Sequence, residues 1–545
     1  MKLVLNTIIL FIFSVINSTL LFSQTAEEYF YKGNDESERG DYSNALADYT
    51  KSIELEPNSP SAYNNRANVY NVLKKYDDAI KDYSKAIELK PDLSSAFFGR
   101  GDSYSALYKY DDAIKDFAEA IVLKKGYLAA YFHRANTYYK IKKYDEAIAD
   151  YSKAIELTID YADAYYSRGN VYVAIKNYDD ALKDYTRTIE IKPDYYDAYN
   201  KRALIYLDKK QYTEAINDLT KIISLKNDDP ETYMKRAGAY SELKKYDSSI
   251  ADYSKTIELN PENYEAYYKR GDIYSELKKY DSAVNDYSKS IGQKADFADV
   301  YYKCGFAYYE LKNYDVAIKD LSKFIEYKQD FHDAYYFRGN SYLESKQTDE
   351  AIGDFSKAIE LKSDDAISYY NRGICYSILK KFSDAIKDYS KGIELKPEYI
   401  SSYLSRAEAF MGVQQYSEAV KDLNKYIDSV KEDTISLNMR GVCFFNLKQY
   451  DSALTDISHA IELDADNVNM LVLRGNIYLE VSKYNEASDD FTKIIGIDKT
   501  NADAYVGRAT AKIKAGTPGD ACSDLKKAKE LGSTGVDDMI KQYCK

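Results

Sequence analysis

A unit of 34 residues repeats fifteen times between Ala26 and Gly535, without an insertion or a deletion. With the unit numbered from position 1 to position 34, position 8 is Gly or Ala in every repeat, and position 20 is Ala in all but one, where Ser249 stands. Position 4 is Tyr or Phe in 13 repeats and position 11 is usually Tyr, which accounts for many of the 60 tyrosines in a chain without tryptophan. The 545 residues therefore indicate one array of stacked units rather than three or four independent domains.

The spacing of the small and apolar positions predicts two helices in each unit. Positions 4, 8 and 11 fall on one face of a first helix, and positions 20, 24, 27 and 28 fall on one face of a second. Position 18 holds Asp, Ser, Thr or Asn in 14 repeats, which predicts the N-cap of the second helix. Helix breakers are scarce, and five of the 8 prolines stand at position 32, where the second helix must end: Pro57, Pro91, Pro193, Pro261 and Pro397. The chain is predicted to be all-α, with each unit a helical hairpin.

This pattern resembles the tetratricopeptide repeat (TPR) family, which has Trp, Leu, Gly, Tyr, Ala, Phe, Ala and Pro at positions 4, 7, 8, 11, 20, 24, 27 and 32. Two departures are Tyr in place of Trp at position 4 and Arg in place of Leu at position 7 in 13 repeats. The resemblance implies a right-handed α-solenoid superhelix, with residues 26–535 as a single solenoid of fifteen repeats and residues 536–545 as a C-terminal capping helix. It also implies that the first helices line a concave groove for a peptide of a partner.

Residues 1–23 read as a secretory signal peptide. A single charge, Lys2, precedes an apolar run from Ile8 to Ile16, and the small residue Ser23 suits signal peptidase. The chain is therefore predicted to be exported to the periplasm or secreted, without stable membrane insertion after cleavage. The alternative is an anchor formed by an uncleaved N-terminal helix.

Charge and motif content argue against several classes of function. The net charge is −13 with both signs interspersed, so no basic field would attract nucleic acid. The three histidines, His133, His332 and His459, lie in different repeats and none is near a cysteine. No P-loop is present, since Gly516 to Gly519 lacks the Lys-Ser/Thr ending. We therefore expect no enzyme activity, no catalytic or metal site, and no cofactor.

Two charged columns recur together. Position 7 is Arg in 13 repeats and position 23 is Asp in all fifteen. One interpretation is a basic stripe that binds a ligand, but position 7 lies among the packing positions 4, 8 and 11, which favours structural ion pairs within or between repeats. Repeat 1 substitutes Lys32 and repeat 9 substitutes Cys304.

The groove is where the repeats differ. Position 5 is aromatic in eight repeats, including Phe30, and position 2 is acidic in eight. Relatives of the chaperone-binding type clamp a terminal carboxylate with Lys at position 5, and no repeat here has it. Family members also use Asn at position 9 to bond a peptide backbone. The candidate peptide-binding residues are Phe98, Phe132, Asn136, Tyr166, Asn170, Tyr268, Tyr302, Tyr336, Asn340 and Tyr370. The alternative is that these aromatic residues only cover neighbouring hairpins.

The five cysteines fall into two groups. Cys304, Cys375 and Cys443 lie at hairpin-core positions of separate repeats and are predicted to be small buried hydrophobes. The C-terminal stretch from Cys522 to Cys544 resembles the ending of exported repeat proteins of Bacteroidetes-type bacteria. That resemblance implies a Cys522–Cys544 disulfide, which an oxidising compartment would maintain.

The sequence thus favours a non-enzymatic scaffold that holds protein or peptide partners of unknown identity in an aromatic, acid-rimmed groove. The alternative is a regulatory or accessory subunit of an enzyme or assembly complex encoded elsewhere. We expect partner binding to centre on repeats 3 to 11, where the aromatic position-5 residues gather.

Overall fold

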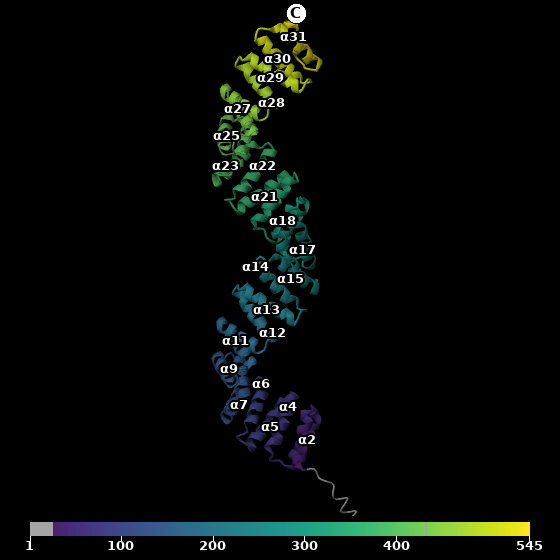
Figure 1. Cartoon of the computed structure of the whole chain (residues 1–545), viewed down its shortest axis with the longest axis vertical. Helices are drawn as coiled ribbons and strands as arrows, with labels where there is room; N and C mark the ends of the chain where they lie inside the picture. The colour runs from purple at the N-terminus through teal and green to yellow at the C-terminus, as the bar shows by residue number, and fades with distance from the viewer. Residues whose placement is uncertain (1–24, 431–432, 545) are drawn as a thin grey trace, which may run out of the picture. The chain divides into compact units, whose positions relative to one another are not determined.

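The computed structural model describes residues 25–430 and 433–544, and every regular element in these ranges is a helix. Each of the fifteen repeats contains a first helix at positions 1–13 and a second helix at positions 17–30, with differences of one residue in repeats 12 and 15. The predicted all-α array of helical hairpins is confirmed. Figure 1 shows the helices with the labels used below. The predicted signal segment, residues 1–23, lies outside the described ranges.

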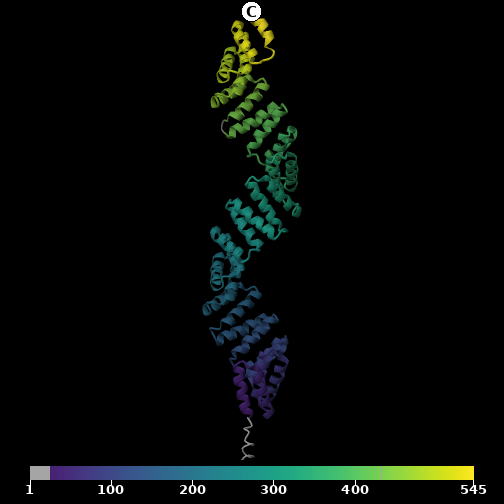
Figure 2. The same cartoon turned by 90° about the vertical axis from the view of Figure 1, so that its right-hand side faces the viewer.

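The helices divide between two compact units, with the boundary in the chain between Pro261 and Glu262. The first unit contains α2 (Ala26–Glu38), α3 (Tyr42–Leu55), α4 (Pro60–Val72), α5 (Tyr76–Leu89), α6 (Ser94–Ala106), α7 (Tyr110–Leu123), α8 (Leu128–Lys140), α9 (Tyr144–Leu157), α10 (Ala162–Ala174), α11 (Tyr178–Ile191), α12 (Tyr196–Asp208), α13 (Tyr212–Leu225), α14 (Pro230–Glu242) and α15 (Tyr246–Leu259). Within this unit each hairpin stacks on the next, as the purple to teal ribbons of Figure 2 show.

The second unit continues the same alternation. It contains α16 (Tyr264–Glu276), α17 (Tyr280–Gln293), α18 (Ala298–Glu310), α19 (Tyr314–Tyr327), α20 (His332–Glu344), α21 (Thr348–Leu361), α22 (Ala366–Ile378), α23 (Phe382–Leu395), α24 (Ser401–Gly412), α25 (Tyr416–Val430), α26 (Thr434–Asn446), α27 (Tyr450–Leu463), α28 (Val468–Glu480), α29 (Tyr484–Ile497), α30 (Ala502–Lys514), α31 (Pro518–Glu530) and α32 (Val536–Tyr543).

Small residues at position 8 allow the two helices of a hairpin to approach closely. A Cβ added to Gly101 in α6 would lie 2.8 Å from Cε1 of Phe117 in α7, closer than real Cβ contacts allow. Ala113, at position 20 of the same repeat, is fully buried. The large residue at position 24 therefore fills the space that the small residue at position 8 leaves, and this pairing repeats along both units.

The turn inside each hairpin depends on one left-handed residue at position 15. Its φ lies between +56° and +63° at thirteen non-glycine residues, most of them lysines, and Gly40 and Gly516 take the same conformation in repeats 1 and 15. Most residues other than glycine adopt this region at a cost. Backbone hydrogen bonds at the end of the first helix close the turn: in repeat 2, Lys74 N–H donates to Asn71 O at 2.9 Å and Lys75 N–H donates to Tyr70 O at 2.8 Å.

The predicted cap at position 18 is wrong. The second helix begins at the aromatic position 17, so the N-cap is position 16 and position 18 lies in the first turn. Asp77 and Asp111, for example, are first-turn residues, where a carboxylate interacts favourably with the positive end of the helix dipole. Because the left-handed residue at position 15 reverses the chain early, the helix starts two residues before the predicted first turn. Of the second helices, α3 and α11 do have side-chain caps, from Asp41 and Asn177.

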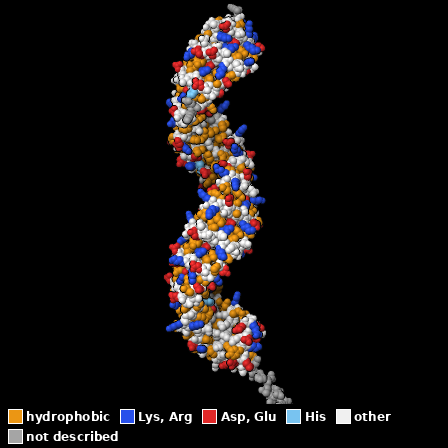
Figure 3. Space-filling model, viewed as in Figure 1, with side chains coloured by type: hydrophobic (Ala, Val, Ile, Leu, Met, Phe, Trp, Pro, Cys, Tyr) orange, Lys and Arg blue, Asp and Glu red, His pale blue; other side chains and the backbone are white. Residues whose placement is uncertain are grey.

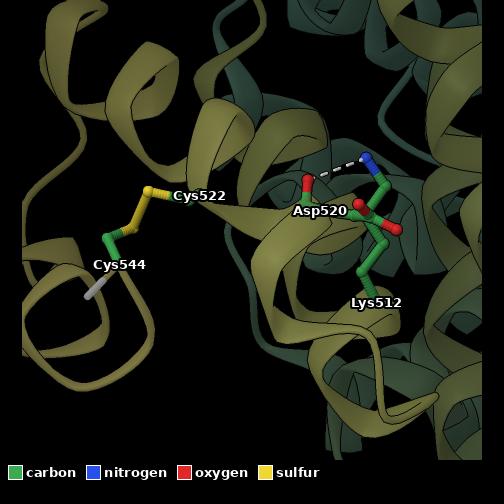
Figure 4. Close-up of a disulfide and its surroundings, with 4 residues drawn as sticks. All are labelled: Lys512, Asp520, Cys522 and Cys544. Atoms are coloured by element: carbon green, nitrogen blue, oxygen red, sulfur yellow. Dashed lines mark hydrogen bonds between the residues drawn. A yellow bond between two sulfur atoms is a disulfide. The ribbon is translucent and has the colours of Figure 1, made fainter.

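The end of the second unit is closed by α32. Val536 is buried against α31, and Met539 and Ile540 pack on the same apolar cluster. A disulfide joins Cys522 in α31 to Cys544 just after α32, with the Cα atoms 5.2 Å apart (Figure 4). No helix in the described part of the chain combines the length and the apolar character that a membrane-spanning helix needs.

Candidate functional site

The position-7 arginines form ion pairs with the position-23 aspartates of their own repeats. In repeat 7, Arg236 donates from Nε to Oδ2 of Asp252 at 2.7 Å and from Nη2 to Oδ1 at 2.8 Å. The Arg236 side chain is 14% exposed and that of Asp252 is 8% exposed. All 13 arginines make this pair. The prediction of structural ion pairs is therefore confirmed, and the arginines do not form a basic stripe for ligands.

Eight of the guanidinium groups also lie between two aromatic rings, at positions 4 and 11. The Cζ atom of Arg236 is 5.7 Å from the ring centroid of Tyr233 at position 4 and 5.8 Å from that of Tyr240 at position 11. Planar guanidinium stacks well on aromatic faces while it bonds a carboxylate in its own plane. The tyrosines at positions 4 and 11 therefore have a second role beyond core packing.

A third hydrogen bond connects the guanidinium to the preceding repeat. Nη1 of Arg236 donates to Oγ1 of Thr220 in α13 at 2.9 Å. At least eleven arginines of the described residues make such a bond to a position-25 side chain, which is Ser, Thr or Asn. Arg134 faces Ala118 at the equivalent place, and alanine has no acceptor on its side chain. One arginine thus fixes the register of three helices: α13, α14 and α15 in this example.

The aromatic position-5 candidates of the first unit, Phe98, Phe132 and Tyr166, are half-buried. The ring of Phe98 lies 5.8 Å from that of Phe117 at position 24 and 5.2 Å from that of Tyr127 at position 34. Phe132 and Tyr166 contact the rings at the same two positions of their own repeats. These side chains therefore cover the hairpin core with one side of the ring and leave the remainder accessible.

In the second unit, Tyr268 and Tyr370 contact the rings at the same two positions of their own repeats. Tyr336 contacts the ring at position 24, and Tyr302 contacts the rings at positions 27 and 34. Tyr302 lies 5.3 Å from Phe324 and 5.0 Å from Phe331, centroid to centroid. Burial raises the pKa of the Tyr302 hydroxyl to about 12, so this group is protonated and able to donate at neutral pH. Tyr370 has its hydroxyl oxygen 3.3 Å from that of Ser405.

The position-9 asparagines are partly committed to the fold. The Tyr151 hydroxyl donates to Oδ1 of Asn136 at 2.5 Å, and the Tyr185 hydroxyl donates to Oδ1 of Asn170 at 2.8 Å. Asn340 is buried, and its Oδ1 accepts from Nδ2 of Asn371 at 2.8 Å. The amide oxygen thus supports a neighbouring side chain in each case. A peptide would have to use the amide Nδ2 groups of Asn136 and Asn170, which are less buried.

A hollow of about 460 Å³ lies along the first helices α4, α6 and α8 of the first unit. Its walls come mainly from positions 9, 12 and 13, and Asn136 is the sequence-predicted residue among them. The other lining residues are Asn71, Val72, Tyr76, Asp102, Ser105, Ala106, His133 and Lys140. Nδ1 of His133 lies 2.6 Å from Oδ1 of Asp102, so the floor of the hollow is polar and hydrogen-bonded.

The acidic position-2 residues have local partners in several repeats. Asp163 accepts from the Tyr195 hydroxyl at 2.9 Å, and Asp299 pairs with Lys328 at 2.6 Å. On the face that Figure 3 shows, red and blue side chains are interspersed. Mixed charge of this kind offers local complementarity to a ligand rather than long-range attraction.

The remaining histidines and cysteines are held within the fold. Nδ1 of His332 lies 2.8 Å from Oδ1 of Asp333, and Nε2 lies 3.1 Å from Oδ2 of Asp365. Cys304, Cys375 and Cys443 are buried free thiols, as predicted. Within residues 25–430 and 433–544, no group of three or more His, Cys, Asp or Glu side chains is placed to hold a metal ion.

Models of the tetratricopeptide repeat match the chain over most of its repeats. Those described as "Tetratricopeptide repeat" match residues 60–93, 162–195, 184–217, 298–331, 366–399 and 404–468. A model described as "TPR repeat" matches residues 33–71, 135–176, 238–278, 271–312 and 339–377. No curated protein matches the chain.

Several solved structures are similar to parts of this chain, and two of the three named here are described as TPR proteins. YrrB, described as a TPR protein with an unusual peptide-binding site, is 23% identical with a TM-score of 0.33 and covers 34% of this chain and 95% of its own. MamA is 28% identical with a TM-score of 0.30, over 31% of this chain and 92% of its own. The C-terminal part of a TPR repeat-containing protein from Cytophaga hutchinsonii is 21% identical with a TM-score of 0.38, and the match covers 44% of this chain and 98% of that structure.

Proposed function

Since the chain belongs to the tetratricopeptide repeat family, we propose that it is a non-enzymatic scaffold that binds peptide segments of partner proteins along its first helices. Repeat arrays present such surfaces because each unit contributes a few side chains to a continuous face. We further propose that it acts in the periplasm or outside the cell, after removal of residues 1–23.

The observation that carries the proposal is the hollow along α4, α6 and α8. It is formed by side chains of successive first helices, and it combines amide, hydroxyl, carboxylate, imidazole and ammonium groups over a short distance. A peptide backbone needs donors and acceptors of this kind, because each residue that becomes buried must keep its hydrogen bonds.

The aromatic position-5 residues support the same face. Phe132 is one position before His133 on α8 and is half-buried, so it offers apolar contact area near the polar floor. In the second unit, Tyr268, Tyr302 and Tyr336 offer the same apolar area with a polar hydroxyl. A ligand with Lys or Arg beside apolar anchors would complement these rings together with the position-2 acids.

Affinity capture with residues 25–545 as bait, on envelope extract of the source organism, tests this function. A partner identified by mass spectrometry is then purified and titrated directly. The variant Asn136→Ala with Lys140→Ala changes the hollow, and the variant Tyr268→Ala, Tyr302→Ala and Tyr336→Ala changes the second unit. We expect one of the two to weaken binding at least tenfold, about 1.4 kcal/mol, with helicity unchanged.

The control is Tyr31→Ala with Tyr108→Ala, which removes two tyrosines that are 58% and 79% exposed and are not candidates. Undiminished affinity in both test variants would place the binding site elsewhere. A loss of helicity in the triple variant would show that the tyrosines are core residues. Capture of an enzyme whose activity changes on binding would favour an accessory subunit.

A further inference from the structure

Repeat 9 lacks the arginine that thirteen other repeats place at position 7, and a cavity lies where its guanidinium would be. Cys304 stands at this position in α18 and is 1% exposed. The cavity has a volume of about 700 Å³, and Cys304 lies in its wall. Its other walls come from α17 and α19, the same three-helix junction that Arg236 occupies in repeat 7.

The groups that hold an arginine elsewhere are all present around this cavity. Tyr301 at position 4 and Tyr308 at position 11 supply the aromatic rings. Asp320 at position 23 supplies the carboxylate, and Ser288 at position 25 of the preceding repeat supplies the hydroxyl. The same residue types at the same four positions surround the guanidinium of Arg372. They are Tyr369, Tyr376, Asp388 and Ser356.

Asp320 differs from every other position-23 aspartate. The other fourteen are buried, while Asp320 is only half-buried. Within the described residues, the other fourteen have a lysine or arginine within 4.0 Å, and no such ion pair is found for Asp320. Burial raises the pKa of its carboxyl. The cavity therefore contains an acid whose charge is uncompensated by a close cation.

Two lysines lie at the cavity and do not take the place of the arginine. Nζ of Lys323 is 2.5 Å from Oε2 of Glu326, so its charge is already paired. Lys319, the residue before Asp320 in the chain, is exposed. Its side chain does not come within 4.0 Å of the Asp320 carboxylate. Burial, followed by the nearby Asp320 charge, raises the pKa of the Cys304 thiol, which is therefore neutral at physiological pH.

The geometry points to a binding site for a guanidinium group in repeat 9, formed by Tyr301, Tyr308, Asp320 and Ser288. A planar cation fits between two tyrosine faces and bonds a carboxylate through two N–H groups, a geometry that an ammonium group cannot reproduce. The source is either an arginine side chain of a partner protein or a free small guanidinium compound. Tyr302, at position 5 of the same helix, for which peptide binding is proposed above, is not among the lining residues, so this site does not depend on that function.

Saturation-transfer NMR with the full chain tests the site. The probes are methylguanidinium and acetyl-Gly-Arg-Gly-amide, with methylammonium and acetyl-Gly-Lys-Gly-amide as matched cations. We expect saturable binding of at least one guanidinium probe, at least tenfold tighter than its ammonium counterpart. Cys304→Arg should abolish this binding, because the new side chain occupies the cavity. Asp320→Asn should weaken it at least tenfold, which gives a second variant if the first does not fold.

A gain-of-site control uses Arg338→Cys, which should create an equivalent cavity beside Asp354 in repeat 10 and double the binding stoichiometry. Equal affinity for methylguanidinium and the arginine peptide would indicate that a free guanidinium compound suffices. Tighter binding of the peptide by tenfold or more would indicate an arginine presented by a protein. Binding that is unchanged in Cys304→Arg and Asp320→Asn, or equal affinity for the ammonium probes, would overturn the proposal.

Discussion

Arg236 and Asp252 lie 16 residues apart in the chain and meet through two parallel N–H to oxygen hydrogen bonds of 2.7 and 2.8 Å. The pair joins the two helices of one hairpin, and the third bond from Arg236 to Thr220 joins that hairpin to the one before it. Its recurrence makes the arginine at position 7 the main polar determinant of register in the array.

Arg236→Ala should lower the free energy of unfolding by roughly 3 kcal/mol, because it leaves the Asp252 carboxylate buried without its cation. Urea denaturation followed by circular dichroism measures the change. The matched control, Lys235→Ala, removes an exposed pair with Glu231 and should change stability by less than about 0.5 kcal/mol. Equal effects of the two substitutions would refute a special role for the buried pair.

Ala118→Ser should stabilise the first unit by roughly 1 kcal/mol, because the new hydroxyl gives Arg134 the third hydrogen bond that its counterparts have. Ser152→Ala is the reciprocal test, since it removes the 2.8 Å bond from Arg168 and should destabilise by a similar amount. The midpoints of thermal and urea unfolding should rise in Ala118→Ser and fall in Ser152→Ala. A destabilising Ala118→Ser would mean that the half-buried site lacks room for the hydroxyl.

Lys244→Gly should stabilise the chain by about 0.5 to 1 kcal/mol. The native φ of +56° is unfavourable for lysine, and glycine adopts it freely, although glycine also has greater entropy in the unfolded chain. Lys245→Gly, one residue later, is the control, because Lys245 has an ordinary φ of −85° and gains nothing from glycine. A higher melting temperature for the control than for Lys244→Gly would contradict the strain argument.

Reduction of the Cys522–Cys544 disulfide, or the substitution Cys544→Ser, should lower the stability of α31 and α32 by roughly 3 kcal/mol in the chain-entropy model. Oxidised protein should show three free thiols after denaturation and five after denaturation with reductant. In the native state these three should react slowly, because burial raises the pKa of Cys375 and of Cys443 to about 12. Five thiols in protein prepared without reductant would exclude the bridge.

Asp524 and Asp320 should titrate on opposite sides of the ordinary aspartate pKa. Burial opposes ionisation of Asp524, but hydrogen bonds from Arg508 and Lys512 hold its pKa below the ordinary value. Its contribution to stability is therefore present above the unfolded pKa and is lost as the pH falls through the folded value. Burial raises the pKa of Asp320, so the cost of its charge in the folded state is relieved as the pH falls.

Carboxyl-carbon NMR of selectively labelled protein measures both midpoints, with Asp524→Asn and Asp320→Asn to assign the signals. Cys304→Arg should move the Asp320 midpoint downward by providing its missing cation. A midpoint for Asp320 below that of Asp524 would contradict this account.

The hairpins and the Arg–Asp pairs could be predicted because both arise from columns that recur with the period. The cap at position 18 could not, since Asp and Ser favour both the N-cap and the first helical turn, and only the backbone path separates the two. The left-handed conformation at position 15 could not be predicted for a related reason. Lysine has no preference for positive φ, so the residue type gives no signal for a conformation that backbone hydrogen bonds at the helix end stabilise.

Two site features were present as signals in the sequence and were missed. Ser, Thr or Asn recurs at position 25, but its role depends on an arginine of the following repeat, which spacing within one unit does not reveal. Cys304 breaks the arginine column visibly, whereas the cavity beside it depends on where Tyr301, Tyr308 and Ser288 place their side chains. The commitment of Oδ1 in Asn136 and Asn170 to tyrosine hydroxyls likewise required three-dimensional contacts.

The hydrogen bond from a position-7 arginine to the preceding repeat has a fixed direction along the chain, because the donor always lies in the later repeat. When the chain emerges with its N-terminus first, a repeat meets the acceptor hydroxyl of the preceding repeat, whereas the arginine that bonds its own position-25 hydroxyl lies about 16 residues further along the chain. Folding of the emerging chain can therefore add hairpins one at a time from the N-terminal side, each packing on a completed neighbour. Removal of a repeat from the C-terminal end deletes an arginine donor, and the hydroxyl left in the preceding repeat can bond to water. Removal of a repeat from the N-terminal end instead leaves the arginine of the following repeat without its acceptor.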